Sequence, residues 1–288
     1  MSAPSVERPR VIRRKLMVPD TPVGAVPRER LDALLRQLVD AHQVLAVTAT
    51  AGAGKSVAVA HASRTFGRLV AWLSVDATDA APGRLVTYLE EALAAQLPSV
   101  RGVATGALAA RIPHAEAAGL LAEATADAEV VLVLDDLERL HGSQQAWDVI
   151  RSIVRYAPPS MRLILISRRA LPPGITSPAL GGEVARVVDA DLAFTVEEAR
   201  IALERRGRSG ADAEAAVAAT GGWVIGVLVR CGALRGPSPR HRRRNRWPWG
   251  LLGRAHPRRT RCHRSRVPHH HLGAGGSDRG VDGRAGRR

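Results

Sequence analysis

The stretch that decides the fold is Val44-Leu45-Ala46-Val47-Thr48, followed by Ala49-Thr50-Ala51-Gly52-Ala53-Gly54-Lys55-Ser56. The first five residues form an apolar run that predicts a buried strand, and residues 57–64 predict a helix. The Gly-rich loop between them follows the pattern G-x-x-x-x-G-K-[ST], except that Ala49 replaces the first glycine. A strand, such a loop and a helix in this order predict a phosphate-binding loop.

The residue types of this loop suit a polyphosphate. Glycines allow backbone angles that aim successive N–H groups at one phosphate, and the following helix adds the positive end of its dipole. The Lys55 ammonium supplies a charge between the outer phosphates, and the Ser56 hydroxyl is a ligand for Mg²⁺. We therefore expect ATP or ADP with Mg²⁺, bound by Gly52, Ala53, Gly54, Lys55, Ser56 and Val57. The alternative is a chance Gly-rich loop, which the strand before it and the helix after it disfavour.

The rest of the first 190 residues predicts an α/β fold. Apolar runs at 69–75, 130–134, 162–166 and 184–188 predict strands, and helical patterns separate most of them. The runs are continuously apolar, which is typical of a parallel sheet covered by helices on both faces. Trp72 and Trp147 are predicted core residues. The expected class is a P-loop NTPase sheet with helices on both faces.

Polar residues follow several of these strands, at the edge where such sheets bind ligands. Asp135 and Asp136 end the strand at 130–134, and Arg168 follows the strand at 162–166. Asp135 is a candidate for holding Mg²⁺ and Asp136 for orienting the attacking water, with Glu138 a weaker candidate. The alternative is that either aspartate caps the next helix. Arg168 is a candidate γ-phosphate sensor, or else a solvated arginine.

One arginine and four histidines lie outside the motifs above. Arg28 stands just before the first helix, which is predicted over about 28–41, where the base and ribose of a nucleotide could lie; the alternative is a surface charge. His42, His61, His114 and His141 show no ligand spacing and are taken as ordinary residues.

Four regions are predicted along the chain. Residues 1–27 read as an extended leader, 28–190 as the α/β ATPase domain, 191–230 as a small helical subdomain, and 231–288 as a disordered Arg-rich tail. In the helical subdomain, Thr195 and Glu198 form the pattern of a capping box, and helices are expected over 196–206 and 211–219.

The net charge of +15 lies entirely in residues 230–288, the tail together with Arg230, which hold 17 arginines against two aspartates. Such a tail favours contact with nucleic-acid phosphates, although it contains no element that would read a base sequence. The two cysteines, Cys231 and Cys262, predict no disulfide framework, and a metal site of Cys262, His263 and residues 269–271 is disfavoured. With no signal sequence or spanning run, we expect a cytoplasmic chain without membrane contact.

The motifs and their order resemble the ATPase module of STAND-type regulators, specifically the MalT-like, large LuxR-type transcriptional activators. The resemblance covers about residues 11–230 and rests on the following stretches, quoted in chain order. They are Arg14-Lys15-Leu16 with Pro19, residues 26–31 (VPRERL), the phosphate loop, residues 70–76 (VAWLSVD), residues 132–137 (LVLDDL), residues 163–168 (LILISR), residues 192–199 (LAFTVEEA) and Gly221-Gly222-Trp223.

The resemblance implies a nucleotide switch. ADP would hold the protein closed and inactive, and inducer and ATP would open it. The open form would self-associate and bind promoter DNA through a C-terminal helix-turn-helix. It also implies that Lys55 and Ser56 bind phosphates and Mg²⁺, that Asp135 holds Mg²⁺, that Asp136 serves hydrolysis, that Arg168 senses the γ-phosphate, and that Arg28 lies near the base. Members of the family are far longer, with further domains expected after residue 230. The Arg-, Pro-, His- and Gly-rich composition there predicts a truncated or frame-shifted member.

Three functions remain to be compared. The leading one is an ATP-binding, slowly hydrolysing signal-transduction domain of a MalT-like regulator that lacks its sensor and helix-turn-helix domains. The alternative is a freestanding nucleic-acid-binding P-loop ATPase that uses the Arg-rich tail. A small-molecule kinase is a third possibility, for which the sequence shows no evident acceptor pocket or lid.

Overall fold

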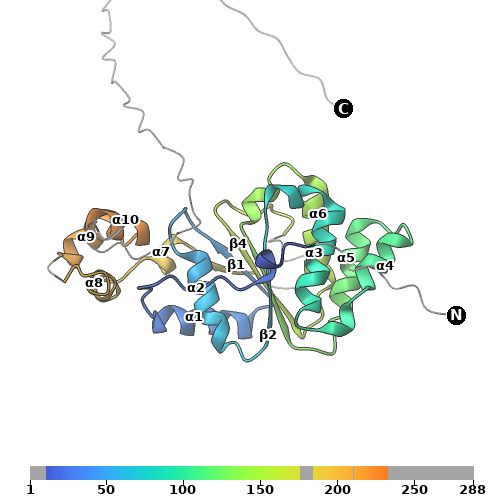
Figure 1. Ribbon diagram of the computed structural model, residues 1–288, viewed down its shortest axis with the longest axis horizontal. Coiled ribbons are helices and arrows are strands. Elements are labelled where there is room, and N and C mark those ends of the chain that lie inside the picture. The colour runs from blue at the N-terminus through green and yellow to red at the C-terminus, as the bar shows by residue number, and fades with distance from the viewer. Residues whose placement is uncertain (1–10, 176–183, 210, 233–288) are drawn as a thin grey trace, which may run out of the picture. The chain divides into compact units, whose positions relative to one another are not determined.

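A five-stranded parallel sheet organises the part of the chain that the computed structural model describes, which is residues 11–175, 184–209 and 211–232. The strand order is β2-β3-β4-β1-β5, and every neighbouring pair is parallel (Figure 1). The strands are β1 (Val44–Thr48), β2 (Leu69–Ser74), β3 (Val130–Asp135), β4 (Met161–Ser167) and β5 (Ala185–Val187). The predicted fold class is confirmed: this is a P-loop NTPase sheet with helices on both faces.

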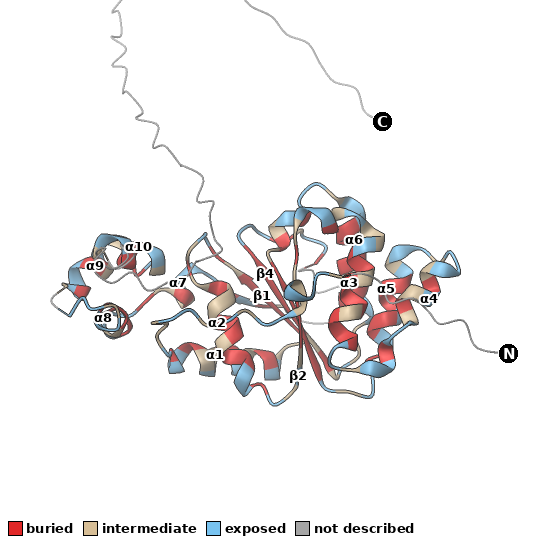
Figure 2. Cartoon of the chain, viewed as in Figure 1, coloured by how far each residue is buried: buried red, intermediate tan, exposed pale blue. Residues whose placement is uncertain are grey.

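Alternate strand residues build two separate apolar layers, one on each face of the sheet. On β3, Val130, Leu132 and Leu134 lie in one layer, and Val131 and Val133 lie in the other. The helices α3 (Pro82–Ala94), α4 (Val103–Ala109), α5 (His114–Glu123) and α6 (Gln144–Tyr156) cover the first face, while α1 (Glu29–Ala41) and α2 (Lys55–Ala62) cover the second. Figure 2 shows the strands buried between these layers. Burial on both faces explains why the strands read as continuous apolar runs.

Most predicted elements lie where expected, and Trp72 and Trp147 are buried. The helix after the phosphate loop begins at Lys55, two residues earlier than predicted, because the last two residues of the loop, Lys55 and Ser56, already belong to the helix. The helical pattern at 99–126 divides into α4 and α5, separated at Pro113, whose extended ψ of 144° cannot continue a helix. Short 3₁₀ turns complete this part: η2 (Ser63–Thr65), η3 (Ala77–Ala80), η4 (Pro98–Val100) and η5 (Leu137–Leu140).

The leader differs from the predicted extended segment, because Arg13–Leu16 forms a short 3₁₀ helix, η1, that is anchored to α3. The Lys15 ammonium pairs with buried Asp79 and lies 4.1 Å from the centre of the Tyr88 ring. The Ile12 N–H donates to the Tyr88 hydroxyl at 3.1 Å. The second half of the leader therefore belongs to the folded structure.

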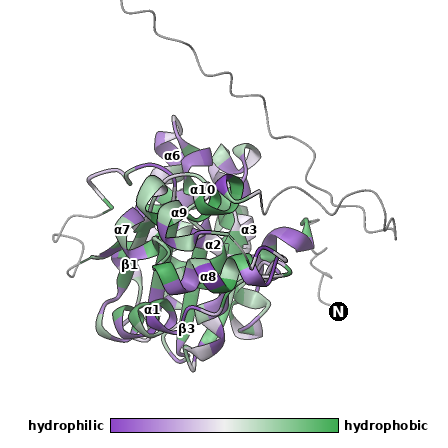
Figure 3. Cartoon of the chain, turned by 90° about the vertical axis from the view of Figure 1, so that its left-hand side faces the viewer, coloured by the Kyte–Doolittle hydropathy of each residue, from purple (hydrophilic) through white to green (hydrophobic). Residues whose placement is uncertain are grey.

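Four helices follow the sheet: α7 (Asp189–Leu192), α8 (Val196–Glu204), α9 (Ala213–Thr220) and α10 (Val224–Arg230). The predicted capping box is confirmed, since the Glu198 N–H donates to Thr195 Oγ1 and the Thr195 N–H donates to Glu198 Oε2, each at 3.1 Å. Gly221 ends α9 with a φ of 62°. Helix α10 was not expected, because only seven residues form it directly after two glycines. Figure 3 looks onto these helices, where α8 turns a largely hydrophilic side outward.

The predicted Arg-rich tail lies outside the described residues from 233 onward, and so do Cys262 and the histidine run. Within the described ranges, none of the helices is both long and apolar enough to cross a membrane.

Candidate functional site

The phosphate loop leaves β1 and enters α2 through two glycines in the left-handed region. Gly52 has a φ of 80°, and Gly54, the N-cap of α2, has a φ of 88°. Residues with a Cβ resist these angles, which explains the glycines at both positions. Ala49, which replaces the first glycine of the pattern, is buried, and its N–H donates to the Ser167 carbonyl at 3.3 Å.

Lys55 holds its ammonium group against the loop itself. Its Nζ donates to the Ala49 carbonyl at 2.7 Å and to the Thr50 carbonyl at 2.9 Å. Burial lowers the pKa of Lys55, and the nearby positive charge of Arg168 lowers it further. No carboxylate of the described residues forms an ion pair with Lys55, so the ammonium remains available to an anionic ligand.

Ser56 and Asp135 meet beneath the loop, where the Ser56 hydroxyl donates to Asp135 Oδ1 at 3.0 Å. Asp135 is 4% exposed, and burial raises its pKa to about 6, with a further contribution from the negative charge of Asp136. A hydroxyl oxygen and a carboxylate oxygen at this distance are a donor set that suits Mg²⁺. The residues predicted for the metal therefore lie together and fit it.

Asp136, Glu138 and Arg168 form a charged group beside this pair. Arg168 lies 3.6 Å from the Asp136 carboxylate and 3.0 Å from that of Glu138, which also accepts from the Arg168 backbone N–H at 3.1 Å. Asp136 has a φ of 61°, an angle that costs free energy in a residue with a Cβ. Burial raises its pKa, as does the charge of Glu138. The candidate catalytic residues Asp136 and Arg168 are thus adjacent, directly after the ends of β3 and β4.

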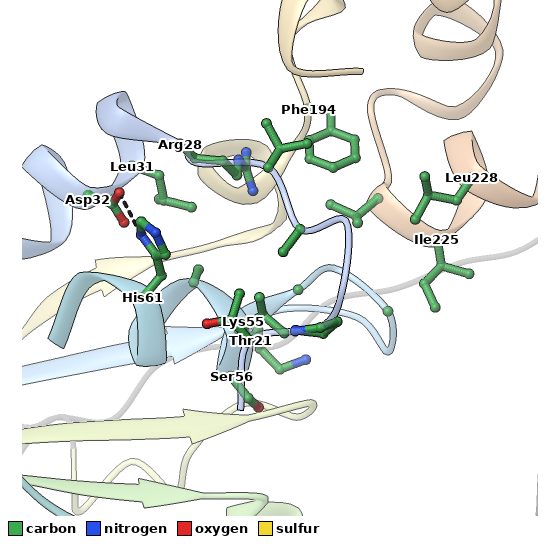
Figure 4. A pocket seen from close by; sticks show the side chains of 18 of the residues that line it. Thr21, Arg28, Leu31, Asp32, Lys55, Ser56, His61, Phe194, Ile225 and Leu228 are labelled. Carbon is green, nitrogen blue, oxygen red and sulfur yellow. Dashed lines mark hydrogen bonds and ion pairs between the residues drawn. The ribbon is translucent and has the colours of Figure 1, made fainter. Parts of the chain in front are cut away.

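A cavity of about 350 Å³ opens beside the loop (Figure 4). Gly52, Gly54, Lys55, Ser56, Val57, Asp136 and Arg168 line it together with Arg28, and so do residues of the leader, α1, α2 and α10. Its size is within the range of small-ligand sites. Among the residues predicted for nucleotide and catalysis, Ala53 and Asp135 do not line the cavity; Ala53 is buried in the loop and Asp135 lies beneath Ser56.

Arg28 contacts the cavity but directs its guanidinium at the helical segment. Its Nε donates to Glu198 at 3.1 Å, and its other nitrogens donate to the Leu192 carbonyl at 3.0 Å and the Ala193 carbonyl at 2.7 Å. Burial lowers its pKa. Arg28 therefore ties α1 to α7 and α8, a contact across more than 160 residues that the sequence does not reveal.

Several contacts at the site were missed by sequence reasoning. The Ile225 N–H donates to the Gly52 carbonyl at 3.2 Å, and the Trp223 indole N–H donates to the Ala51 carbonyl at 3.0 Å, so α10 begins against the loop. Asp189 accepts from the backbone and the hydroxyl of Thr50, at 2.9 and 2.7 Å. These contacts join distant parts of the chain, and the sequence contains no local signal for them.

Asp32 and His61 also line the cavity, and their side chains lie 2.9 Å apart. The sequence did contain a signal for these two residues, namely their helical spacing. Asp32 is four residues after Arg28 on α1, and His61 is four residues after Val57 on α2, so each shares a helix face with a predicted site residue.

The comparisons with known proteins agree with a P-loop NTPase module. No protein-family model matches the chain. The HTH-type transcriptional regulator MalT of Serratia proteamaculans is 30% identical over 196 residues, which are 66% of this chain and 21% of that protein. The chain thus spans about a fifth of the length of the curated relative that it matches.

Two solved structures are similar to this chain at low sequence identity. The Walker-type ATPase PABY2304 of Pyrococcus abyssi has a TM-score of 0.48 and 15% identity, covering 74% of this chain and 69% of its own. The Orc1 protein of Aeropyrum pernix, solved in complex with DNA, has a TM-score of 0.45 and 21% identity, covering 65% and 50%. On its own sheet, loop and sequence similarity, this chain carries a P-loop NTPase module that is similar to part of MalT.

Proposed function

We propose that residues 11–230 bind ATP with Mg²⁺ and hydrolyse it slowly, as the nucleotide switch of a MalT-like transcriptional regulator. One observation carries the proposal: the cavity is lined by Gly52, Gly54, Lys55, Ser56 and Arg168 on one rim of the sheet, and the Ser56 hydroxyl donates to Asp135 beneath it. A buried ammonium, the backbone amides of a Gly-rich loop and a hydroxyl beside a carboxylate are complementary to a magnesium polyphosphate.

Each group of residues would have its own role in binding and hydrolysis. The loop amides and Lys55 would hold the phosphates, and Ser56 with Asp135 would hold Mg²⁺, which neutralises charge on the outer phosphates when bound. Asp136 would orient a water, and Arg168, which pairs with both Asp136 and Glu138, would sense the outermost phosphate. Asp135 must be ionised to hold the cation, although burial favours its neutral form.

The regulatory part of the proposal rests on α10 and on the similarity to MalT. Val224, Ile225 and Leu228 line the cavity from the helical segment, so a ligand there contacts both the loop and α10. A ligand that binds better when α10 contacts the phosphate loop than when the two are apart shifts the equilibrium toward the contact. Self-association and DNA binding would belong to the whole regulator, in which this module would be the switch.

The test of this function is ATP affinity, measured by calorimetry with Mg²⁺ on the full chain. Lys55→Ala should weaken ATP binding by at least about 100-fold, because the ammonium makes charge-assisted hydrogen bonds with the polyphosphate. The control is Arg169→Ala, which removes an exposed positive charge from the same rim without touching the cavity. Equal affinity of the wild type and Lys55→Ala would contradict the proposal.

A second function is favoured by the distribution of charge, since residues 230–288 hold the whole excess of positive charge. In this alternative the chain is a nucleic-acid-binding ATPase, and its tail contacts phosphates. DNA affinity should then fall steeply with salt and vanish when residues 231–288 are deleted. Affinity that does not change with the deletion would leave the switch as the better account.

A further inference from the structure

The cavity continues from the phosphate loop along two facing helices. Gly54, the N-cap of α2, shares one helix face with Val57, Ala58 and His61. Arg28, the N-cap of α1, shares one face with Leu31 and Asp32. His61 is six residues beyond Lys55, which places it ~9 Å farther along the helix axis. This distance is close to the length of a nucleoside whose phosphates lie in the loop. The far part of the cavity is therefore the place for a base.

Many of the residues that line the cavity are apolar, which suits the faces of an aromatic base. Pro22, Ala25 and Val26 of the leader, Leu31 of α1, and Val57 and Ala58 of α2 are among the residues that line the cavity. Figure 4 shows the Asp32–His61 pair at one end of the cavity, away from Ile225 and Leu228.

The polar side chains that line the same region are mostly engaged by the protein itself. Arg28 is bonded to Glu198 and two carbonyls. Arg206 donates to the Gly24 carbonyl at 2.6 Å and the Ala202 carbonyl at 3.0 Å, and Thr21 accepts from Arg64 at 3.2 Å. Within the described residues, Asp32 and His61 hydrogen-bond through their side chains only with each other.

This pair presents hydrogen-bond acceptors. In the tautomer whose Nδ1–H donates to Asp32 Oδ2, at 2.9 Å, the His61 ring carries a lone pair on Nε2. Asp32 Oδ1 is the second unused acceptor. Two neighbouring acceptors suit an amino group with two N–H bonds, and they repel a carbonyl oxygen.

We propose that Asp32 and His61 select the base of the bound nucleotide by accepting hydrogen bonds from the exocyclic amino group of adenine. This inference rests on the proposed ATP binding and deepens it. Inosine triphosphate (ITP) is the natural probe, because it has a carbonyl oxygen where ATP has this amino group and is otherwise the same at every phosphate.

The experiment measures the affinities of the full chain for ATP and ITP with Mg²⁺ by calorimetry. The wild type should prefer ATP by about tenfold or more, as expected when one or two hydrogen bonds distinguish the ligands. Asp32→Ala should reduce this ratio about tenfold, and His61→Ala should reduce it in the same direction. The ATP-to-ITP ratio does not change when a variant loses affinity for both ligands equally. If Asp32→Ala fails to fold, His61→Gln is the replacement variant.

Two controls distinguish a failure of the base assignment from a failure of the proposed ATP binding. Asp40→Ala removes an exposed acid from the same helix and should leave the ATP-to-ITP ratio unchanged. Lys55→Ala should weaken ATP and ITP equally. A wild-type ratio near one, a ratio that survives both Asp32→Ala and His61→Ala, or a preference for GTP would overturn the base assignment while ATP binding stands. If Lys55→Ala weakens neither ligand, the nucleotide function itself fails.

Discussion

The cavity has two sides that are stabilised in different ways. The α/β side packs large aliphatic and aromatic residues on both faces of the sheet. The helical side has a small buried cluster of eight residues, four of them alanines, which contribute little when buried: Phe194, Ala199, Ala202, Leu203, Ala213, Ala216, Val227 and Leu228.

Polar contacts then connect the helical side to the rest. They include Arg28 with Glu198, Arg206 with the Gly24 carbonyl, and Trp223 with the Ala51 carbonyl. The phosphate loop therefore belongs to the firmly packed α/β side. The helical side, α7 to α10, is held to it by hydrogen bonds and should separate first.

The largest effect should come from breaking the Arg28 link. Arg28→Ala removes three hydrogen bonds and the contact of the guanidinium with the Phe194 ring, and it leaves the Glu198 carboxylate without its main partner. We expect the helical side to lose about 3 kcal/mol of stability, typical of breaking a buried ion pair. Calorimetry should show a separate, earlier unfolding transition.

Arg30→Ala is the matched control, because Arg30 contacts the same carboxylate at 3.5 Å but is exposed. It should change stability by less than about 1 kcal/mol. If Arg28→Ala and Arg30→Ala unfold alike, in one transition, the two sides are not stabilised differently.

A smaller effect tests the firmly packed side. The folded pKa of Asp135 is about 6, above the ordinary value of 3.8, so between these pH values the folded state holds a proton that the unfolded chain has released. Stability should therefore rise as pH falls through this window. Asp135→Asn should remove that rise and stabilise the protein without nucleotide at neutral pH by about 2 kcal/mol. Urea unfolding across the window checks this, and a variant with the wild-type pH profile would refute it.

The smallest effect concerns the contact between the two sides. A Cβ at Gly52 would lie 2.7 Å from Ile225 Cγ1, and the φ of 80° is itself unfavourable for alanine. Gly67 has a φ of 65° with open space around it. Gly52→Ala should therefore cost about 1 kcal/mol more than Gly67→Ala in urea unfolding. Equal costs would mean that the contact with α10 contributes nothing.

The sequence predicted most elements on both sides of the cavity, but it did not predict the contacts that join the two sides, for physical reasons. Strands such as Val130–Asp135 are fully buried, so their composition alone reveals them, and the loop and acids follow those strands directly. The Arg28–Glu198 pair and the start of α10 at the loop depend on tertiary contacts between distant residues. His61 was taken as ordinary because its partner, Asp32, lies 29 residues away on another helix.

Amide hydrogen exchange of the full chain, with and without ATP and Mg²⁺, tests most directly whether backbone amides grip the polyphosphate. The account predicts that the ligand slows exchange most strongly at residues 52–57, with a weaker effect on α10. It also predicts that Lys55→Ala removes both effects. Exchange at residues 52–57 that is the same with and without the ligand, under conditions where ATP is bound, would contradict the account.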